Sequence, residues 1–221
     1  MTSRAGRSPR PFTGQYVFVG GLHRTGTSLL ARMMAAHPDI AQITDAPVPE
    51  AEGCYLQGAI PHTARHGIPG HYATDPAQHL IEECRFDTLQ TRERLEADWD
   101  RWFEPGNAWR IEKSPVNLTR MRLYQQLFPL AHFVVILRHP EAMAAALAKW
   151  TDRPASELID YALDAYDLAL ADAAYLHHSY VLRYEDLVQS GDRLLESVFA
   201  WLGLPPAAHG LTLRDGNADY P

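Results

Sequence analysis

Cysteine is scarce in this sequence. Its 221 residues include only Cys54 and Cys84, and neither lies in a Cys-x-x-Cys pair. Two thiols with this spacing do not indicate the disulfide framework of a secreted domain. We therefore expect reduced cysteines and a cytoplasmic protein.

Long apolar runs and an excess of positive charge are also missing. No run approaches the roughly 20 apolar residues of a membrane-spanning helix. No apolar segment follows the basic N-terminal stretch MTSRAGRSPRP, as a signal peptide requires. The formal net charge of −7 argues against a general binder of nucleic acid or of anionic membranes. We expect a flexible arm over residues 1–13, and neither nucleic acid nor a membrane as a partner.

The residues that are present indicate one globular domain over residues 14–205, followed by a tail over 206–221. With 46% hydrophobic and 21% charged residues, the composition is ordinary for a soluble protein. Apolar β-branched runs alternate with helical patterns, which predicts an α/β fold of three layers, with a parallel sheet of about four to five strands covered on both faces. The predicted strands are Gln15–Gly20, Ala108–Glu112, Phe133–Leu137 and Tyr180–Tyr184. The predicted helices are Ser28–His37, Val116–Leu127, Glu141–Trp150, Ser156–Leu176 and Asp192–Leu202, and helical patterns also occur within Asp75–Phe103.

A glycine loop follows the first predicted strand. The stretch VFVGGLHRTGTSLLARMM has the GxxxxGK[ST] spacing of a phosphate-binding loop, with Thr27 in place of the lysine and Arg24 inside the loop. The N–H groups of Thr25 to Ser28 would face an anion at the start of a helix. The missing lysine disfavours a Mg-dependent kinase or ATPase, whereas an arginine fork suits phosphate or sulfate. The alternative is a glycine turn without a ligand.

Three further polar clusters follow predicted strands, namely Lys113-Ser114, Arg138-His139 and Tyr184–Asp186. In parallel sheets, ligands bind at the carboxyl ends of the strands. We therefore expect these clusters to meet the glycine loop at one edge of the sheet.

Several segments, in this order, resemble the sulfotransferase family. HRTGTSLL is similar to the family's 5′-phosphosulfate loop, especially to the arginine version of tyrosylprotein sulfotransferases and related bacterial enzymes. HPDI and EKSPVN fit the same pattern. FVVILRHPEAMAAALAKW resembles the second signature, a strand followed by Arg-x-Pro, and LRYEDLVQSGDRLLESVFAWLGLPP resembles the late Tyr-Glu-Asp-Leu segment. The resemblance covers about residues 16 to 205 and implies a P-loop-like fold, 3′-phosphoadenosine 5′-phosphosulfate (PAPS) as donor, and no metal.

The resemblance also implies roles for individual residues. The residues that would cradle the 5′-phosphosulfate are Arg24, Thr25, Gly26, Thr27 and Ser28. Arg24 would reach toward the transferring group, where negative charge grows on the leaving phosphate oxygen. Arg138 would hold the 3′-phosphate, with a salt bridge at a strand end as the alternative, and Tyr184 would contact the nucleotide.

One position departs from the family pattern. Eight residues after the signature arginine the family usually has a serine that binds the 3′-phosphate, and this chain has Ala146. Losing a hydrogen bond to a charged group costs about 1.5–3 kcal/mol, unless another donor such as Lys149 compensates.

Glu52 is the predicted general base. Cytosolic sulfotransferases have Lys-Thr-His where this chain has Lys113-Ser114-Pro115, so their histidine has no counterpart here. Tyrosylprotein sulfotransferases use a glutamate after the first helix, where this chain offers Asp45, Glu50 and Glu52. Asp45 and His62 remain alternatives to Glu52. Lys113 is predicted to stabilise the leaving group, with an ordinary surface lysine as the alternative.

The sequence favours a PAPS-dependent sulfotransferase acting on a hydroxyl or an amine. The acceptor is a small molecule or a carbohydrate, and a peptide stays open. The alternatives are a nucleotide-dependent kinase of P-loop type and a non-catalytic, degraded relative. The short tail, in which Arg214 and Tyr220 are possible remnants of a closing segment, fits either a truncated chain or an open site. His62 and His66 have i, i+4 spacing, but the prolines and glycines around them disfavour the helix that a metal site would need.

Overall fold

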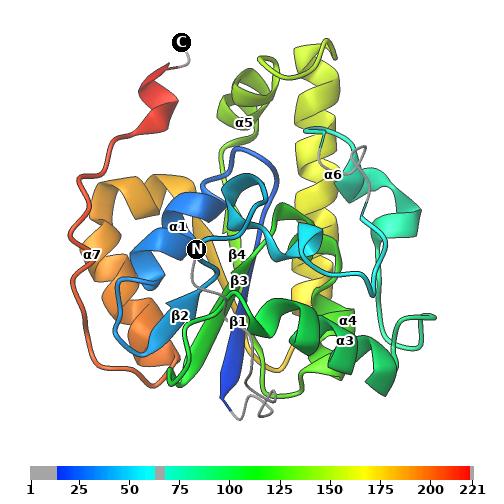
Figure 1. Ribbon diagram of the computed structural model, residues 1–221. Helices are drawn as coiled ribbons and strands as arrows, with labels where there is room; N and C mark the ends of the chain where they lie inside the picture. The colour runs from blue at the N-terminus through cyan, green and yellow to red at the C-terminus, as the bar shows by residue number, and fades with distance from the viewer. Residues whose placement is uncertain (1–13, 63–67, 220–221) are drawn as a thin grey trace.

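A computed structural model of the chain describes residues 14–62 and 68–219 (Figure 1). Five parallel strands form one sheet in the order β2-β3-β1-β4-β5. The strands are β1 (Gln15–Gly20), β2 (Ile40–Gln42), β3 (Trp109–Lys113), β4 (His132–Leu137) and β5 (Ser179–Arg183). The central strand is therefore β1, whose Val17 is in register with Ile111 of β3 and with His132 of β4.

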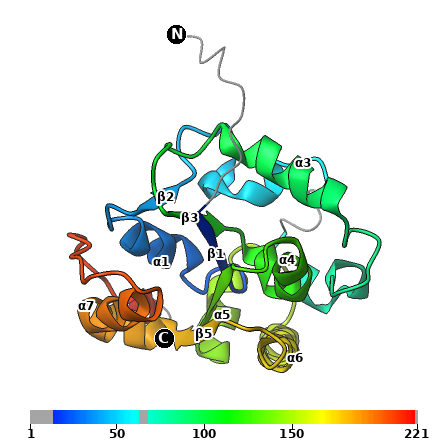
Figure 2. The same cartoon turned by 90° about the horizontal axis from the view of Figure 1, so that it is seen from below.

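Helices cover both faces of the sheet, as Figures 1 and 2 show from two directions. On one face lie α1 (Thr27–Met34) and α7 (Tyr184–Trp201), and on the other lie α3 (Leu89–Asp100), α4 (Met121–Leu127) and α6 (Ala155–Ala173). α5 (Pro140–Leu147) follows β4 at the upper edge in Figure 1. This three-layer arrangement confirms the predicted α/β fold.

The pleat of β1 divides the apolar core into two clusters. Val17 and Val19 pack into the cluster shared with α1 and α7. Tyr16 and Phe18 point the other way, into a larger cluster with the helices of the opposite face. Successive side chains of a strand point to opposite faces, so a strand apolar at every position must be covered on both.

Short 3-10 turns replace longer helices in the segment between β2 and α3. These turns are Pro49–Ala51, Gly53–Tyr55, Tyr72–Thr74 and Pro76–Gln78. The hydroxyl of Tyr72 lies 2.8 Å from the carbonyl oxygen of Gly21 and 2.9 Å from that of Pro115. The fully buried Tyr72 therefore fixes this segment to the loops that follow β1 and β3.

The predicted elements differ from the observed ones in four places. The sequence pattern missed β2, and within residues 75–103 it overestimated the helix, which is confined to Leu89–Asp100. The segment after β3 divides into a 3-10 turn, Pro115–Thr119, and then α4. The last helix begins at Tyr184, well before the predicted start, and is interrupted at Ser190, where φ is −143°.

The predicted arm over residues 1–13 lies outside the described residues. Within the described part of the chain, no helix is long and apolar enough to cross a bilayer. Cys54 and Cys84 are both free thiols.

Candidate functional site

The loop between β1 and α1 forms a tight turn around the carbonyl of Leu22. That oxygen accepts hydrogen bonds from Thr25, from its Oγ1 at 2.7 Å and from its backbone N–H at 3.1 Å. Arg24 and Gly26 have positive φ values of 72° and 98°. A Cβ atom on Gly26 would lie 2.6 Å from Cδ2 of Tyr184. Only glycine fits at position 26, because both the backbone angle and the neighbouring ring exclude a side chain.

The loop leaves the start of α1 available to an anion. Gly26 is the N-cap of α1 and has no side chain to accept from the first N–H groups of the helix. Those N–H groups belong to Thr27 and Ser28, and the helix dipole favours negative charge near them. The N–H and hydroxyl of Thr25 are committed to the turn, so Thr25 shapes the loop. The exposed Arg24 has its guanidinium 6.0 Å from the ring centroid of Trp150.

Arg138, directly after β4, joins the loop to the C-terminal segment. It is 6% exposed, and its Nη1 donates to the carbonyl of Arg24 at 2.7 Å. Its Nε donates to Oδ1 of Asn217, also at 2.7 Å. The guanidinium lies 4.5 Å from the ring centroid of Tyr184. Two predicted nucleotide-site residues, Arg138 and Tyr184, are therefore in contact with each other and with the loop.

The C-terminal 3-10 turn, Gly216–Asp219, packs on this arginine. The N–H of Gly216 donates to the hydroxyl of Tyr184 at 2.8 Å, and Nδ2 of Asn217 donates to Oε1 of Glu185 at 3.0 Å. The sequence pointed to Arg214 and Tyr220 instead. Arg214 is exposed, and Tyr220 lies outside the described residues. Nothing in the sequence pattern singled out Asn217.

Lys113 and Glu52 meet at the end of β3. Nζ of Lys113 lies 3.3 Å from Oε1 of Glu52 and donates to the carbonyl of Glu50 at 2.8 Å. Both side chains are buried, with Lys113 6% and Glu52 8% exposed, so the alternative of a surface lysine is wrong. Burial raises the pKa of Glu52 above its ordinary value, while the adjacent ammonium group opposes this increase.

The turn that supplies these contacts has an unusual backbone. The φ angles of the consecutive residues Glu50 and Ala51 are 51° and 52°. Non-glycine residues adopt this region at a cost of about 1–3 kcal/mol each. The surrounding contacts must hold the turn in place, and the bond from Lys113 to the Glu50 carbonyl is one of them. The alternatives to Glu52 lie elsewhere: Asp45 is exposed in a turn after β2, and His62 packs edge-on against Tyr55.

The buried carboxyl group of Glu112 holds the backbone next to Glu52. Glu112, in β3, has no exposed surface and accepts hydrogen bonds from the N–H of Gly53, from Oγ of Ser114 and from Nδ2 of Asn117 at 2.9, 2.6 and 2.6 Å. Burial raises its pKa. Glu112 thus fixes the residue next to Glu52. No sequence pattern marks this role, because Glu112 resembles an ordinary strand residue.

His23 lies beside the site as a neutral group. Its imidazole ring meets the ring of Tyr72 edge-on, with centroids 5.4 Å apart. Burial, with a smaller contribution from the positive charge of Lys113, lowers the pKa of His23 to about 4. At neutral pH this histidine adds no charge next to Arg24.

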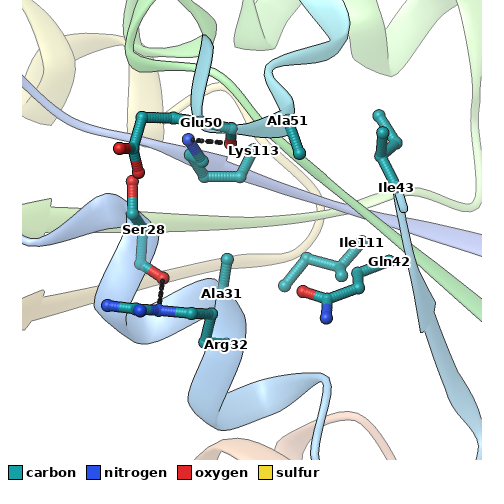
Figure 3. A pocket seen from close by; sticks show the side chains of 9 residues that line it. All are labelled: Ser28, Ala31, Arg32, Gln42, Ile43, Glu50, Ala51, Ile111 and Lys113. Carbon is teal, nitrogen blue, oxygen red and sulfur yellow. Dashed lines mark hydrogen bonds between the residues drawn. The ribbon is translucent and has the colours of Figure 1, made fainter. Parts of the chain in front are cut away.

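A cavity of about 290 Å³ opens between α1, β2, β3 and the turn at residues 49–51 (Figure 3). Its polar lining residues are Ser28, Arg32, Gln42, Glu50 and Lys113, and the other lining side chains are aliphatic. Figure 3 shows the side chains of Ser28 and Glu50 pointing toward one another. The cavity therefore adjoins both the first turn of α1 and the ammonium group of Lys113.

Among residues 14–62 and 68–219, no group of three or more His, Cys, Asp or Glu side chains is arranged to hold a metal ion. His66, half of the i, i+4 pair with His62, lies outside these ranges.

Comparisons with known proteins agree with this geometry. A model described as the sulfotransferase family matches residues 16–208. Nodulation protein NoeE of Sinorhizobium fredii is 28% identical in an alignment of 220 residues, which covers 86% of this chain and 50% of that protein. The chain thus spans about half the length of this curated relative.

Solved sulfotransferase structures share the fold. Sulfotransferase STF9 from Mycobacterium avium superposes with a TM-score of 0.60 at 15% identity, covering 95% of this chain and 67% of that one. The sulfotransferase domain of the Synechococcus PCC 7002 olefin synthase gives a TM-score of 0.56 at 18% identity, covering 97% and 84%. At these identities the likeness concerns the fold alone.

Proposed function

The chain belongs to the sulfotransferase family, and from this premise we propose that it transfers a sulfuryl group from PAPS to a hydroxyl or amine of an acceptor. The observation that carries the proposal is the Arg138 guanidinium, which joins the backbone of the glycine loop to the C-terminal turn through two hydrogen bonds of 2.7 Å. An arginine fork between two oxygen acceptors is suited to a phosphate group.

The residues fit the proposed donor in two places. The uncapped first turn of α1 is suited to a phosphosulfate, with Arg24 at the edge of the loop. Arg138 would hold the 3′-phosphate against the Tyr184 ring, taking over the bond that Nε now makes to Asn217. The family's serine is absent, and Ala146 is fully buried in α5, so that position supplies no donor. When bound, PAPS supplies an activated sulfuryl group.

The chain's own residues would then stabilise the developing negative charge and accept a proton from the acceptor. The acceptor oxygen would form a bond to sulfur while the bond from sulfur to the phosphate oxygen breaks, leaving 3′-phosphoadenosine 5′-phosphate (PAP). Arg24 and Lys113 would stabilise the negative charge that grows on the leaving phosphate. Glu52 would accept the acceptor's proton, and burial adapts it to this role by raising its pKa.

Calorimetric titration of the protein with PAP, with ADP and Mg-ATP as comparisons, tests the proposal. We expect micromolar binding of PAP and much weaker binding of ADP, which lacks the 3′-phosphate. Equal binding of PAP and ADP would favour a nucleotide kinase, and binding of none of the three would favour a non-catalytic relative.

A further inference from the structure

We propose that the cavity beside Lys113 is the acceptor site and that it takes a neutral, polyhydroxylated ring, the chemistry of a carbohydrate unit. This inference rests on the proposed function and adds the substrate class. The cavity shares Lys113 with the proposed catalytic site and Ser28 with the proposed phosphosulfate loop. A ligand in it would therefore lie next to the position where the sulfuryl group is transferred.

The size of the cavity limits the acceptor. Its volume of about 290 Å³ lies at the lower end of ligand pockets, which span roughly 300–1,000 Å³. One ring with its substituents fits this space, whereas an extended peptide would have to continue outside it.

The polar lining selects hydroxyl groups. Arg32 and Lys113 offer only donors, Glu50 offers only acceptors, and Gln42 offers both. A hydroxyl group both donates and accepts, so neighbouring hydroxyls on one ring can satisfy this mixed set. Lys113 is already paired with Glu52, and Arg32 and Glu50 carry opposite charges, so the lining has no excess charge of one sign and favours a neutral ligand.

The apolar lining disfavours a phenol. The aliphatic lining residues are Ala31, Ile43, Ala51 and Ile111, and none of the described residues adds an aromatic ring to the lining. Aromatic ligands gain from stacking against rings, by about 0.5–1.5 kcal/mol for a well-placed pair. A phenol would lack this stacking contribution and has a single hydroxyl for the mixed polar lining, whereas a sugar ring has several.

Glu50 is assigned as the residue that binds the acceptor, and Glu52 as the residue that faces Lys113. The side chain of Glu50 lines the cavity, while the carboxylate of Glu52 is buried beside the Lys113 ammonium. The positive φ angles of Glu50 and Ala51 turn the chain between the two side chains, so the two carboxylates lie in separate positions. A substitution at Glu50 should therefore act mainly on acceptor affinity, and one at Glu52 mainly on turnover.

The first experiment measures sulfuryl transfer from radiolabelled PAPS to a panel of methyl hexopyranosides, methyl deoxyhexopyranosides and disaccharides, with simple phenols as the comparison. Calorimetry of the PAP-saturated protein with the same compounds gives binding without turnover. We expect glycosides to bind and to be sulfated, and phenols to do neither. Sulfation of phenols alone, or the absence of glycoside binding to the PAP-saturated protein, would overturn the inference and leave the proposed function standing. Failure of PAP itself to bind would instead contradict the proposed function.

Two variants locate the binding in the cavity. Ala31→Leu places a larger side chain in the space, with Ala200→Leu on the exposed face of α7 as its matched control. We expect kcat/KM for the best glycoside to fall at least tenfold in Ala31→Leu, with PAP affinity unchanged within twofold. Glu50→Gln keeps the shape of the side chain, and Glu196→Gln on α7 is its control. The Glu50→Gln substitution should raise the glycoside KM about tenfold, as expected for a lost hydrogen bond to a charged group. Its kcat should stay within threefold of the parent value.

If Ala31→Leu fails to fold, Glu50→Gln decides alone. A large fall in kcat with unchanged KM in Glu50→Gln would place Glu50 at the proton transfer and overturn its assignment to acceptor binding. Unchanged kinetics in both variants would place the acceptor outside the cavity.

Discussion

At the scale of single residues, Arg138 makes three contacts that only an arginine can make together. One edge of its planar group holds the Arg24 carbonyl, its Nε holds Asn217, and its face lies against Tyr184. A lysine carries the same charge as a point on a flexible stem and lacks the fork.

Arg138→Lys should therefore reduce PAP affinity at least tenfold, because a charge-assisted pair of hydrogen bonds becomes a single contact. ADP affinity should change less than threefold, since ADP has no 3′-phosphate. Calorimetry with both nucleotides measures the difference, and the exposed Arg183→Lys serves as the control. An equal loss for both nucleotides would mean that Arg138 acts on the loop and has no specific role at the 3′-phosphate.

The second prediction concerns the acid side of the pH–rate profile. A general base acts when deprotonated, and burial raises the pKa of Glu52 above the ordinary 4.5. The kcat/KM of the parent protein should therefore fall as pH decreases through a value above 4.5. Glu52→Gln should lower kcat about a hundredfold or more and remove this limb, while exposed Glu141→Gln should keep it. A Glu52→Gln variant that retains the limb would assign the base to another group, with Asp45 and His62 as the next candidates.

At the scale of elements, Gly26 in the glycine loop needs both a left-handed backbone angle and the absence of a side chain. Gly26 has φ of 98° and faces the Tyr184 ring, whereas Gly203 has φ of 72° and no atom within 4 Å of an added Cβ. Gly203→Ala should cost about 1–2 kcal/mol of unfolding free energy from the backbone alone. Gly26→Ala should cost more and should also reduce PAP affinity, because the ring that supports Arg138 must move. If chemical denaturation gives equal losses of unfolding free energy for the two variants, the Tyr184 ring moves aside without a cost in stability.

The C-terminal turn gives a separate prediction. Asn217 bonds to Arg138 through its carbonyl oxygen and to Glu185 through its amide nitrogen. Asn217→Asp would offer Arg138 a carboxylate, which competes with a phosphate, and would place a second negative charge beside Glu185. We expect PAP affinity to fall about tenfold, and the loss to diminish at high salt as screening increases. Asn107→Asp, at the other end of the sheet, should bind PAP as the parent does.

The sequence predicted those elements whose pattern is local. β1 and β4 were predicted to within one residue, because apolar β-branched runs bounded by turns are strong signals. The predicted bounds of β3 and β5 differ from the observed ones by one residue. β2 was not predicted, because a strand of three residues is too short to show a pattern. The start of α7 at Tyr184 was not predicted either, because Tyr184 to Asp186 were interpreted as a polar ligand cluster at the end of a strand.

The candidate site was predictable only where a motif marks it. The glycine spacing marks the loop at Arg24 to Ser28, whereas Arg138 was indicated by its place after a strand and by the resemblance of that segment to a family signature. Asn217 on Arg138, Glu112 beneath Gly53 and the cavity beside Lys113 depend on contacts between segments far apart in the chain. No local pattern records such contacts.

At the scale of the whole molecule, buried histidines make stability depend on pH. The pKa of His23 is lowered from 6.5 to about 4 in the folded protein. Between these pH values His23 therefore binds a proton in the unfolded chain and not in the folded protein. Stability is therefore lost as pH falls from 6.5 toward 4, by up to about 3 kcal/mol from this residue. Burial and the stacked His178 ring also lower the pKa of His132. The raised pKa values of Glu52 and Glu112 act in the opposite direction, since their protonated forms favour folding.

A His23→Gln variant isolates one contribution to this profile. We expect its unfolding free energy to decline about 2–3 kcal/mol less than that of the parent between pH 7 and pH 4.5. Urea denaturation at several pH values measures both curves. Parallel curves for the two proteins would show that His23 is protonated equally in the folded and unfolded states.

The central position of β1 has a consequence for how the chain acquires its fold. β1 is synthesised before both of its neighbours, because Val17 pairs with Ile111 and His132, which leave the ribosome much later. Pairing over such long separations slows folding and leaves apolar strands exposed while they wait. The strand that carries the glycine loop therefore stays unpaired until β3 and β4 have been synthesised. Its binding loop can take shape only after most of the chain has been made.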